Sequence, residues 1–185
     1  MGKLSKEEIR TLVTRWLDCL DEYQIQASKD NFLEKHSGMF DGHVLSDRDL
    51  RERILDAKKV GKKIDATCFT ISRKEIVELV KESICKEMVG IIDWIMDGLD
   101  ERDFAITYEP GKVIGKGFHS KWYHVWNAGA CPCSQVRVIL RKQTDRPGFK
   151  VLTAYPVASR NEVEEMMRAS YEYEQAHPRK TKRAK

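Results

Sequence analysis

The stretch from residue 134 to residue 157 constrains the fold of this chain more than any other, because it predicts a β-hairpin. Its centre, residues 143–148, contains Asp145, Pro147 and Gly148, which favour the backbone angles of a turn. On both sides of this turn the side chains alternate as in strands that bury one face. The first strand alternates Val136, Val138 and Leu140 with Arg137, Ile139 and Arg141, and the second runs from Phe149 to Pro156.

The second strand of this hairpin places two hydroxyl groups close together. A period of two residues predicts Val151, Thr153 and Tyr155 on one face, with Leu152 and Ala154 on the other. Two neighbouring hydroxyls can donate hydrogen bonds to a phosphate. Threonine and tyrosine are also common in strands for packing reasons alone. The pair by itself therefore leaves a functional and a purely structural interpretation open.

Three further strands are predicted before the hairpin. From Asp103 the apolar pattern changes from a helical period to a period of two, and Pro110-Gly111 marks a turn. The predicted strands are Phe104–Glu109, Lys112–Phe118 and Trp122–Ala128. Because helices come first and about five strands follow, we expect an α+β fold, with N-terminal helices packed on a C-terminal antiparallel sheet.

Capping boxes mark the starts of three of the expected helices. Each pairs a serine with an acidic residue three positions later, which satisfies two free backbone N–H groups. The pairs are Ser5 with Glu8, Ser46 with Asp49, and Ser72 with Glu75. We expect the first helix to end near Tyr23 and the third, the longest, near Gly98. Shorter helices are expected over residues 29–35 and 162–175.

The chain is long enough for one domain with short appendages. We expect a helical extension over residues 1–28, a main domain over 29–158, and a C-terminal helix with a basic tail over 159–185. Residues 177–185 hold five of the 33 lysines and arginines and no acidic residue, which leaves 28 basic residues against 29 acidic ones elsewhere. Any nucleic-acid contact in the main domain must therefore come from local clustering of charge.

Composition excludes several classes of protein. No apolar run approaches the roughly 20 residues that span a bilayer. The charged N-terminus lacks the apolar centre of a signal peptide, so we expect a cytoplasmic protein, with delivery into a target cell left open. The five cysteines are odd in number and widely spread, which argues against a disulfide framework. Only Cys131 and Cys133 are close, and we expect no metal and no cofactor because a second pair at zinc spacing is missing.

The side chains that remain suit metal-free cleavage of RNA. In that chemistry a 2′-hydroxyl attacks the neighbouring phosphate while a histidine accepts its proton and cationic or hydroxyl groups stabilise the charge. Histidine titrates near working pH, and arginine binds two phosphate oxygens at once. The sequence shows no carboxylate cluster with the spacing that a metal-dependent nuclease needs.

The order of several motifs resembles one known family, the pancreatic-ribonuclease-like toxin domain at the C-termini of bacterial contact-dependent growth inhibition proteins. The resemblance covers roughly residues 30–157, and its most specific piece is the final strand. The matching motifs are Glu34-Lys-His36, Ser46-Asp-Arg-Asp-Leu50-Arg-Glu-Arg53-Ile54, Ala66-Thr-Cys-Phe69-Thr, Ile92-Asp-Trp-Ile95, Gly111-Lys-Val-Ile114-Gly115, Val136-Arg-Val-Ile-Leu-Arg141 and Val151-Leu-Thr-Ala-Tyr-Pro156.

By this resemblance the site residues are His36, Arg53, Thr153 and Tyr155. It implies a histidine acting as general acid or base, an arginine on the phosphate and two hydroxyls on the transition state. Six residues more than the family usually has separate His36 from the serine that starts the next helix, so His43 is an alternative. The Glu-Lys-His context favours His36.

The resemblance implies a metal-independent endoribonuclease toxin that leaves a 2′,3′-cyclic phosphate and is restrained by a cognate immunity protein. Two other interpretations stay open on the sequence. One is a non-catalytic RNA-binding or protein-interaction module that relies on the basic tail. The other is a regulatory protein that binds a partner through its first helix.

Overall fold

The computed structural model of the chain describes residues 4–20, 39–40, 43–97, 102–120, 129–143 and 148–177, with the backbone alone for 39–40 and 43–44. The helices are α1 (Lys6–Cys19), α4 (Asp47–Lys59), α5 (Arg73–Lys86), α6 (Met88–Met96) and α7 (Arg160–Ala176). The strands are β1 (Met39–Phe40), β2 (His43–Val44), β3 (Ala66–Phe69), β4 (Asp103–Tyr108), β5 (Gly115–Phe118), β6 (Cys131–Cys133), β7 (Gln135–Lys142) and β8 (Phe149–Val157).

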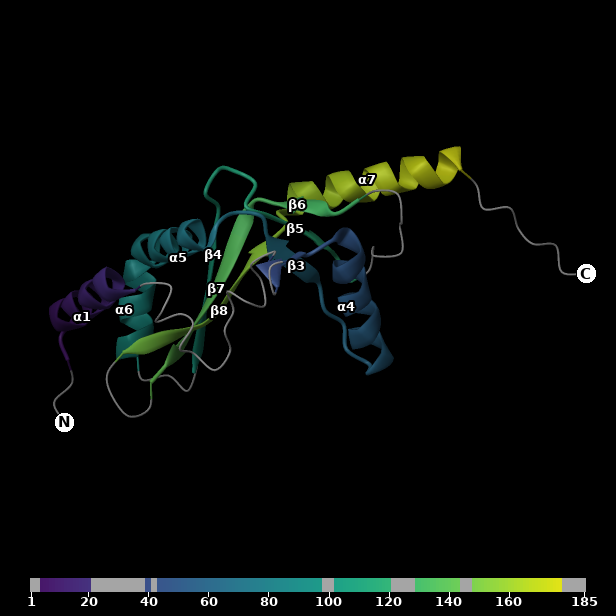
Figure 1. Cartoon of the computed structure of the whole chain (residues 1–185). Helices are drawn as coiled ribbons and strands as arrows, with labels where there is room; N and C mark the ends of the chain where they lie inside the picture. Colours follow the sequence, from purple (N-terminus) through teal and green to yellow (C-terminus); the bar gives the residue numbers. More distant parts are fainter. Residues whose placement is uncertain are drawn as a thin grey trace, which may run out of the picture.

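The strands pair antiparallel and the fold is α+β, as expected. The described strands form two three-stranded sheets in place of the expected single one, in the orders β4-β7-β8 and β3-β5-β6, and β1 pairs with β2. Figure 1 shows α1, α5 and α6 on one side of the strands and α4 and α7 on the other. The predicted hairpin is β7 and β8.

The three predicted capping boxes are present, and a fourth starts α7. In each, the serine side chain accepts from the backbone N–H three residues on, and the acidic side chain accepts from the serine N–H. The fourth box pairs Ser159 with Glu162. These hydrogen bonds lie within the first turn of each helix, so they fix the starts of the helices without a tertiary contact.

The ends of two helices differ from the prediction. The first helix ends at Cys19 and not near Tyr23. The long helix expected after Ser72 is two helices, because the chain leaves helical geometry at Glu87 and starts again as α6. The predicted helix over 29–35 and the predicted strand Trp122–Ala128 lie outside the described residues.

Two apolar cores hold the elements together. The larger one packs α1, α5 and α6 on the β4-β7-β8 sheet and includes the ring contacts of Phe149 with Trp16 and Trp94 at 4.7 and 6.4 Å between centroids. The smaller one lies between α4 and the β3-β5 pair. Its members are Leu45, Leu50, Ile54, Ala66, Cys68 and Phe118.

Candidate active site

Strand β8 presents Thr153 and Tyr155 on one face, as the sequence predicted. Both residues are half-buried, while Ala154 between them is fully buried. In the ladder with β7, Thr153 lies opposite Ile139 and Tyr155 opposite Arg137. The two hydroxyl-bearing side chains are therefore next-but-one neighbours on the same side of a strand.

The prediction that Val151 shares this face was wrong. Thr153 pairs with Ile139, but Leu140 pairs with Val151, so Leu152 is an extra residue in β8. This β-bulge shifts the alternation by one position. Val151 consequently lies on the buried face with Ala154, and the hydroxyl pair faces the other way.

The β3-β5-β6 sheet approaches β8 closely at Gly115. A Cβ atom on Gly115 would lie 2.6 Å from both the Cβ and the Cγ atom of Pro156 and 2.6 Å from the carbonyl oxygen of Cys68. Because real Cβ contacts of that length are essentially absent, only glycine allows this approach. The end of β8, where Tyr155 lies, is thus placed against β3 and β5.

Arg53 lies half-buried on α4, the helix that packs against β3. Burial raises the pKa of the Cys68 thiol, and the positive charges of Lys116 and Arg53 oppose that rise. The helix is held in place by Asp47, which accepts a hydrogen bond from Lys116 Nζ at 2.8 Å and one from the backbone N–H of Ala130 at 3.2 Å. Arg53 therefore lies on a helix that packs against β3, and β3 contacts β8.

The two candidate histidines fall at the edge of what the structure describes. His36 lies outside the described residues, and for His43 the backbone alone is described, in β2. His43 is two residues before Leu45, which packs into the smaller core with Cys68. Since two residues span at most about 7 Å, the backbone of His43 lies near the α4–β3 layer that carries Arg53.

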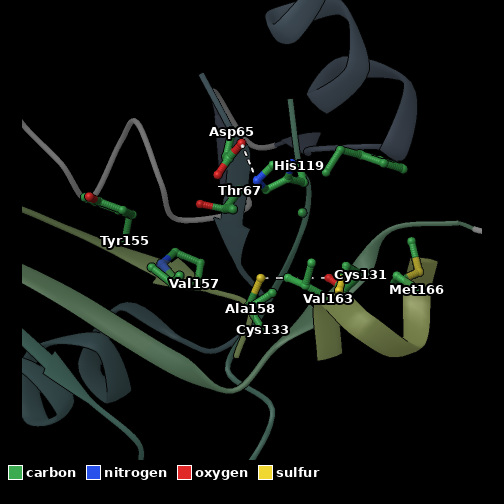
Figure 2. Close-up of a pocket in the computed structure, with 13 residues that line it drawn as sticks. Asp65, Thr67, His119, Cys131, Cys133, Tyr155, Val157, Ala158, Val163 and Met166 are labelled. Carbon is green, nitrogen blue, oxygen red and sulfur yellow. Dashed lines mark hydrogen bonds and ion pairs between the residues drawn. The ribbon is translucent and has the colours of Figure 1, made fainter. Parts of the chain in front are cut away.

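A cavity of about 110 Å³ opens beside Tyr155 (Figure 2). The polar residues that line it include Tyr155, Thr67, Asp65 and His119. His119 Nε2 lies 3.8 Å from Asp65 Oδ1, and the same oxygen accepts a hydrogen bond from the backbone N–H of Ser120 at 2.8 Å. The rest of the lining is mainly apolar and includes Val157, Ala158, Val163 and Met166.

The first turns of α7 supply a wall of this cavity through Val163 and Met166. Glu162 holds that turn in place, because its carboxylate accepts from the backbone N–H of Ser159 at 2.6 Å and of Ser134 at 3.3 Å. The helix is thereby tied to the junction between β6 and β7.

Cys131 and Cys133 line the cavity from β6, a strand that the sequence analysis missed. Burial, reinforced by Glu162, raises the pKa of Cys131 to about 11, and burial raises the pKa of Cys133 as well. Both side chains are therefore thiols at neutral pH, so they act as small apolar groups and not as nucleophiles.

The structure thus adds Thr67, Asp65 and His119 to the surroundings of Tyr155. No pattern in the sequence assigns them a role beside the hydroxyl pair, because the pairing of β3 with β5 brings them together across about 50 residues of chain. Within the described ranges, no group of three or more His, Cys, Asp or Glu residues is placed to hold a metal ion. In the same ranges, no helix is both long and apolar enough to cross a membrane.

Comparison with known proteins identifies the family. The family described as the bacterial CdiA-CT RNAse A domain matches residues 38–156, well over half of the chain. A solved structure, the CdiA-CT/CdiI complex from Y. kristensenii 33638, has a similar fold, with a TM-score of 0.53 and 19% sequence identity over 68% of this chain and 97% of that chain. The search of curated proteins found no match. On this evidence the chain belongs to the bacterial CdiA-CT RNAse A domain family, and its general activity is that of a ribonuclease toxin.

Proposed function

We propose that the chain is a metal-independent endoribonuclease that cleaves RNA by attack of a 2′-hydroxyl on the adjacent phosphate and leaves a 2′,3′-cyclic phosphate. The observation that carries the proposal is the pair of hydroxyl-bearing side chains, Thr153 and Tyr155, on one face of β8, of which Tyr155 lines an open cavity. Two donors at next-but-one positions suit the equatorial oxygens of a phosphate that gains charge in the transition state.

The proposed roles follow from the chemistry of each group. Tyr155 and Thr153 donate hydrogen bonds to the phosphoryl oxygens, and Arg53 adds a positive charge and a planar pair of donors. A histidine accepts the proton of the 2′-hydroxyl. The bond from the 2′-oxygen to phosphorus forms as the bond to the 5′-oxygen of the next nucleotide breaks.

The histidine is either His36 or His43. The Glu-Lys-His motif favours His36, whereas the segment matched by the family starts at residue 38 and so contains His43 but not His36. The position of His43 two residues before Leu45 of the smaller core also supports His43.

We also propose a cognate immunity protein as partner and the cytoplasm of a target cell as the place of action. The similar solved structure is described as a complex of CdiA-CT with CdiI. A ribonuclease that meets its own cell's RNA needs such an inhibitor, and inhibitor and RNA would compete if the inhibitor covered the face of β8 that carries Tyr155.

RNA cleavage with EDTA present tests the proposed reaction. We expect total RNA to be degraded in EDTA, with 2′,3′-cyclic phosphate ends, and Tyr155→Phe to slow cleavage about 10²- to 10³-fold, the range for a lost transition-state donor. Either His36→Ala or His43→Ala should slow it about 10²- to 10⁴-fold, and the other should not.

The matched control is Tyr171→Phe, because Tyr171 is 65% exposed on α7 and does not line the cavity. Melting curves should show that all four variants stay folded. Cleavage that stops in EDTA, or ends that carry a 3′-hydroxyl, would contradict the proposed chemistry. RNA binding without cleavage would support a binding module instead.

A further inference from the structure

The ends of β3 and β5 place the carboxylate of Asp65 close to the imidazole of His119 at the cavity. Ala66 pairs with Phe118 in the ladder, so Asp65 just before β3 meets His119 just after β5. The Nε2–Oδ1 distance is 3.8 Å, and the backbone N–H of Ser120 fixes the same carboxylate oxygen at 2.8 Å. Both side chains are partly open to solvent, with 35% of His119 and 51% of Asp65 exposed, so a substrate can reach them.

This pair shares its cavity with the proposed transition-state donor Tyr155. Thr67 also lines the cavity, and Figure 2 shows its hydroxyl directed to the side on which Tyr155 lies. Tyr155 and His119 both line this cavity, whose volume is about 110 Å³. Another part of the cavity wall, from Val163 and Met166, is apolar.

The proposed reaction needs a second proton transfer that the residues assigned so far do not supply. One group removes the proton of the 2′-hydroxyl, and another must protonate the 5′-oxygen as it leaves, because an alkoxide is a poor leaving group. A carboxylate close to an imidazole holds the ring in one orientation for such a transfer.

Resting on the proposed ribonuclease function, we propose that His119 is a catalytic residue, the general acid for the leaving 5′-oxygen, and that Asp65 is its positioning residue. The bond from phosphorus to the 5′-oxygen breaks, its electron pair stays on that oxygen, and the proton passes to it from the His119 imidazolium. The products are the 2′,3′-cyclic phosphate, a free 5′-hydroxyl and neutral His119. The imidazole regains a proton from solvent before the next turnover.

Two substrates that differ in their leaving group test this role with the full-length protein. One set is the dinucleoside phosphates with each of the four bases on the 5′ side, whose leaving group is a 5′-hydroxyl. The other set is the matching nucleoside 3′-(4-nitrophenyl phosphates), whose leaving group departs without a proton. For His119→Ala we expect a loss of about 10²- to 10⁴-fold on the dinucleotides and less than about tenfold on the nitrophenyl esters.

Asp65→Asn should show the same selectivity with a smaller loss, because it changes the orientation of the ring and not the ring itself. His177→Ala is the matched control, since His177 stacks on Tyr173 at 4.3 Å between ring centroids and does not line the cavity. Activity of each variant on the nitrophenyl esters also shows that it is folded.

Equal losses on both substrates, or no loss on either, would overturn the role of His119 while leaving the ribonuclease function intact. A wild-type protein that cleaves neither substrate nor total RNA would refute the proposed function itself. The two failures are therefore distinguishable in one set of assays.

Discussion

At the scale of single residues, Gly115 is the position on which the site geometry depends most directly. Its missing side chain lets β5 and β8 approach, and the atoms that a Cβ would meet are a proline ring and a backbone carbonyl. Neither can move aside as the end of a flexible side chain does. The approach of the two sheets therefore places Tyr155 beside β3, where the cavity forms.

Gly115→Ala should destabilise the fold by about 1–3 kcal/mol, because a methyl group forced into a packed contact displaces backbone. It should also slow RNA cleavage, since the displacement moves the end of β8. Urea unfolding and the RNA assay measure the two effects.

Gly90→Ala provides the control for this substitution. Gly90 lies inside α6, where alanine is favoured over glycine by up to about 1 kcal/mol. The nearest atom to an added Cβ is the terminal Oε1 of Glu87 at 2.7 Å, which can rotate away. Phe104 Cζ would lie 3.3 Å from the added Cβ and must give by a few tenths of an ångström, so we expect stability within about 1 kcal/mol of the wild type. A loss as large as that of Gly115→Ala would contradict the specific role of the Gly115 contact.

At the scale of elements, the sequence predicted the features that depend on hydrogen bonds or side-chain patterns within one short segment. The serine and acidic pairs at Ser5, Ser46 and Ser72 identified three helix starts, and alternation identified β7 and β8. The break at Glu87, the strand β6 and the bulge at Leu152 were missed. Strand β6 and the bulge depend on how two strands pair, which the pattern of a single segment does not report. The Asp65–His119 pair was missed for the same reason.

The capping box of α4 makes a pH-dependent contribution to stability. Hydrogen bonds from the Ser46 hydroxyl and backbone N–H hold the pKa of Asp49 below its ordinary value. A carboxylate whose pKa is lower in the folded state than in the unfolded state stabilises the fold. This contribution is complete above the unfolded pKa of about 3.9 and is lost as the pH falls through the folded pKa. Asp49→Asn should therefore lower Tm at pH 7, and the difference should narrow below about pH 4.

Asp56→Asn on the same helix is the control for this prediction, because it removes the same charge outside the capping box, where Asp56 pairs with Lys59. Its effect on Tm should be smaller at pH 7. Melting curves between pH 2.5 and 7 measure the difference in Tm between each variant and the unchanged protein. A difference for Asp49→Asn that stays constant over this range would refute the pH-dependent role of the Asp49 carboxylate.

At the scale of the whole molecule, α1 is part of the main core although it precedes the segment that the family matches. Ile9, Val13 and Leu17 are buried against α6 and the β4-β7-β8 sheet, and Trp16 contacts Phe149. The division into an extension over residues 1–28 and a main domain stays a prediction. The shared core indicates that α1 and the sheet unfold together.

Leu17→Ala should lower the free energy of unfolding by about 2–4 kcal/mol, the range for a buried leucine, in a single cooperative transition. Leu12→Ala, at a position that is 41% exposed on the same helix, should cost less than about 1 kcal/mol. Denaturant unfolding followed by fluorescence and by circular dichroism measures both. Two separate transitions would mean that α1 unfolds independently of the sheet.

The surplus residue at Leu152 has a consequence for how this protein can vary. Removing it would leave Leu140 paired with Val151 and Ile139 with Thr153 in plain alternation, so Thr153 and Tyr155 would keep their face and Ala154 would stay buried. Because Leu152 has no partner in the ladder, its side chain or even its presence can change without turning the phenol toward the core. The residues that pair with β7 set the face on which the hydroxyls lie, and the surplus residue only lets the nine residues of β8 run beside the eight of β7.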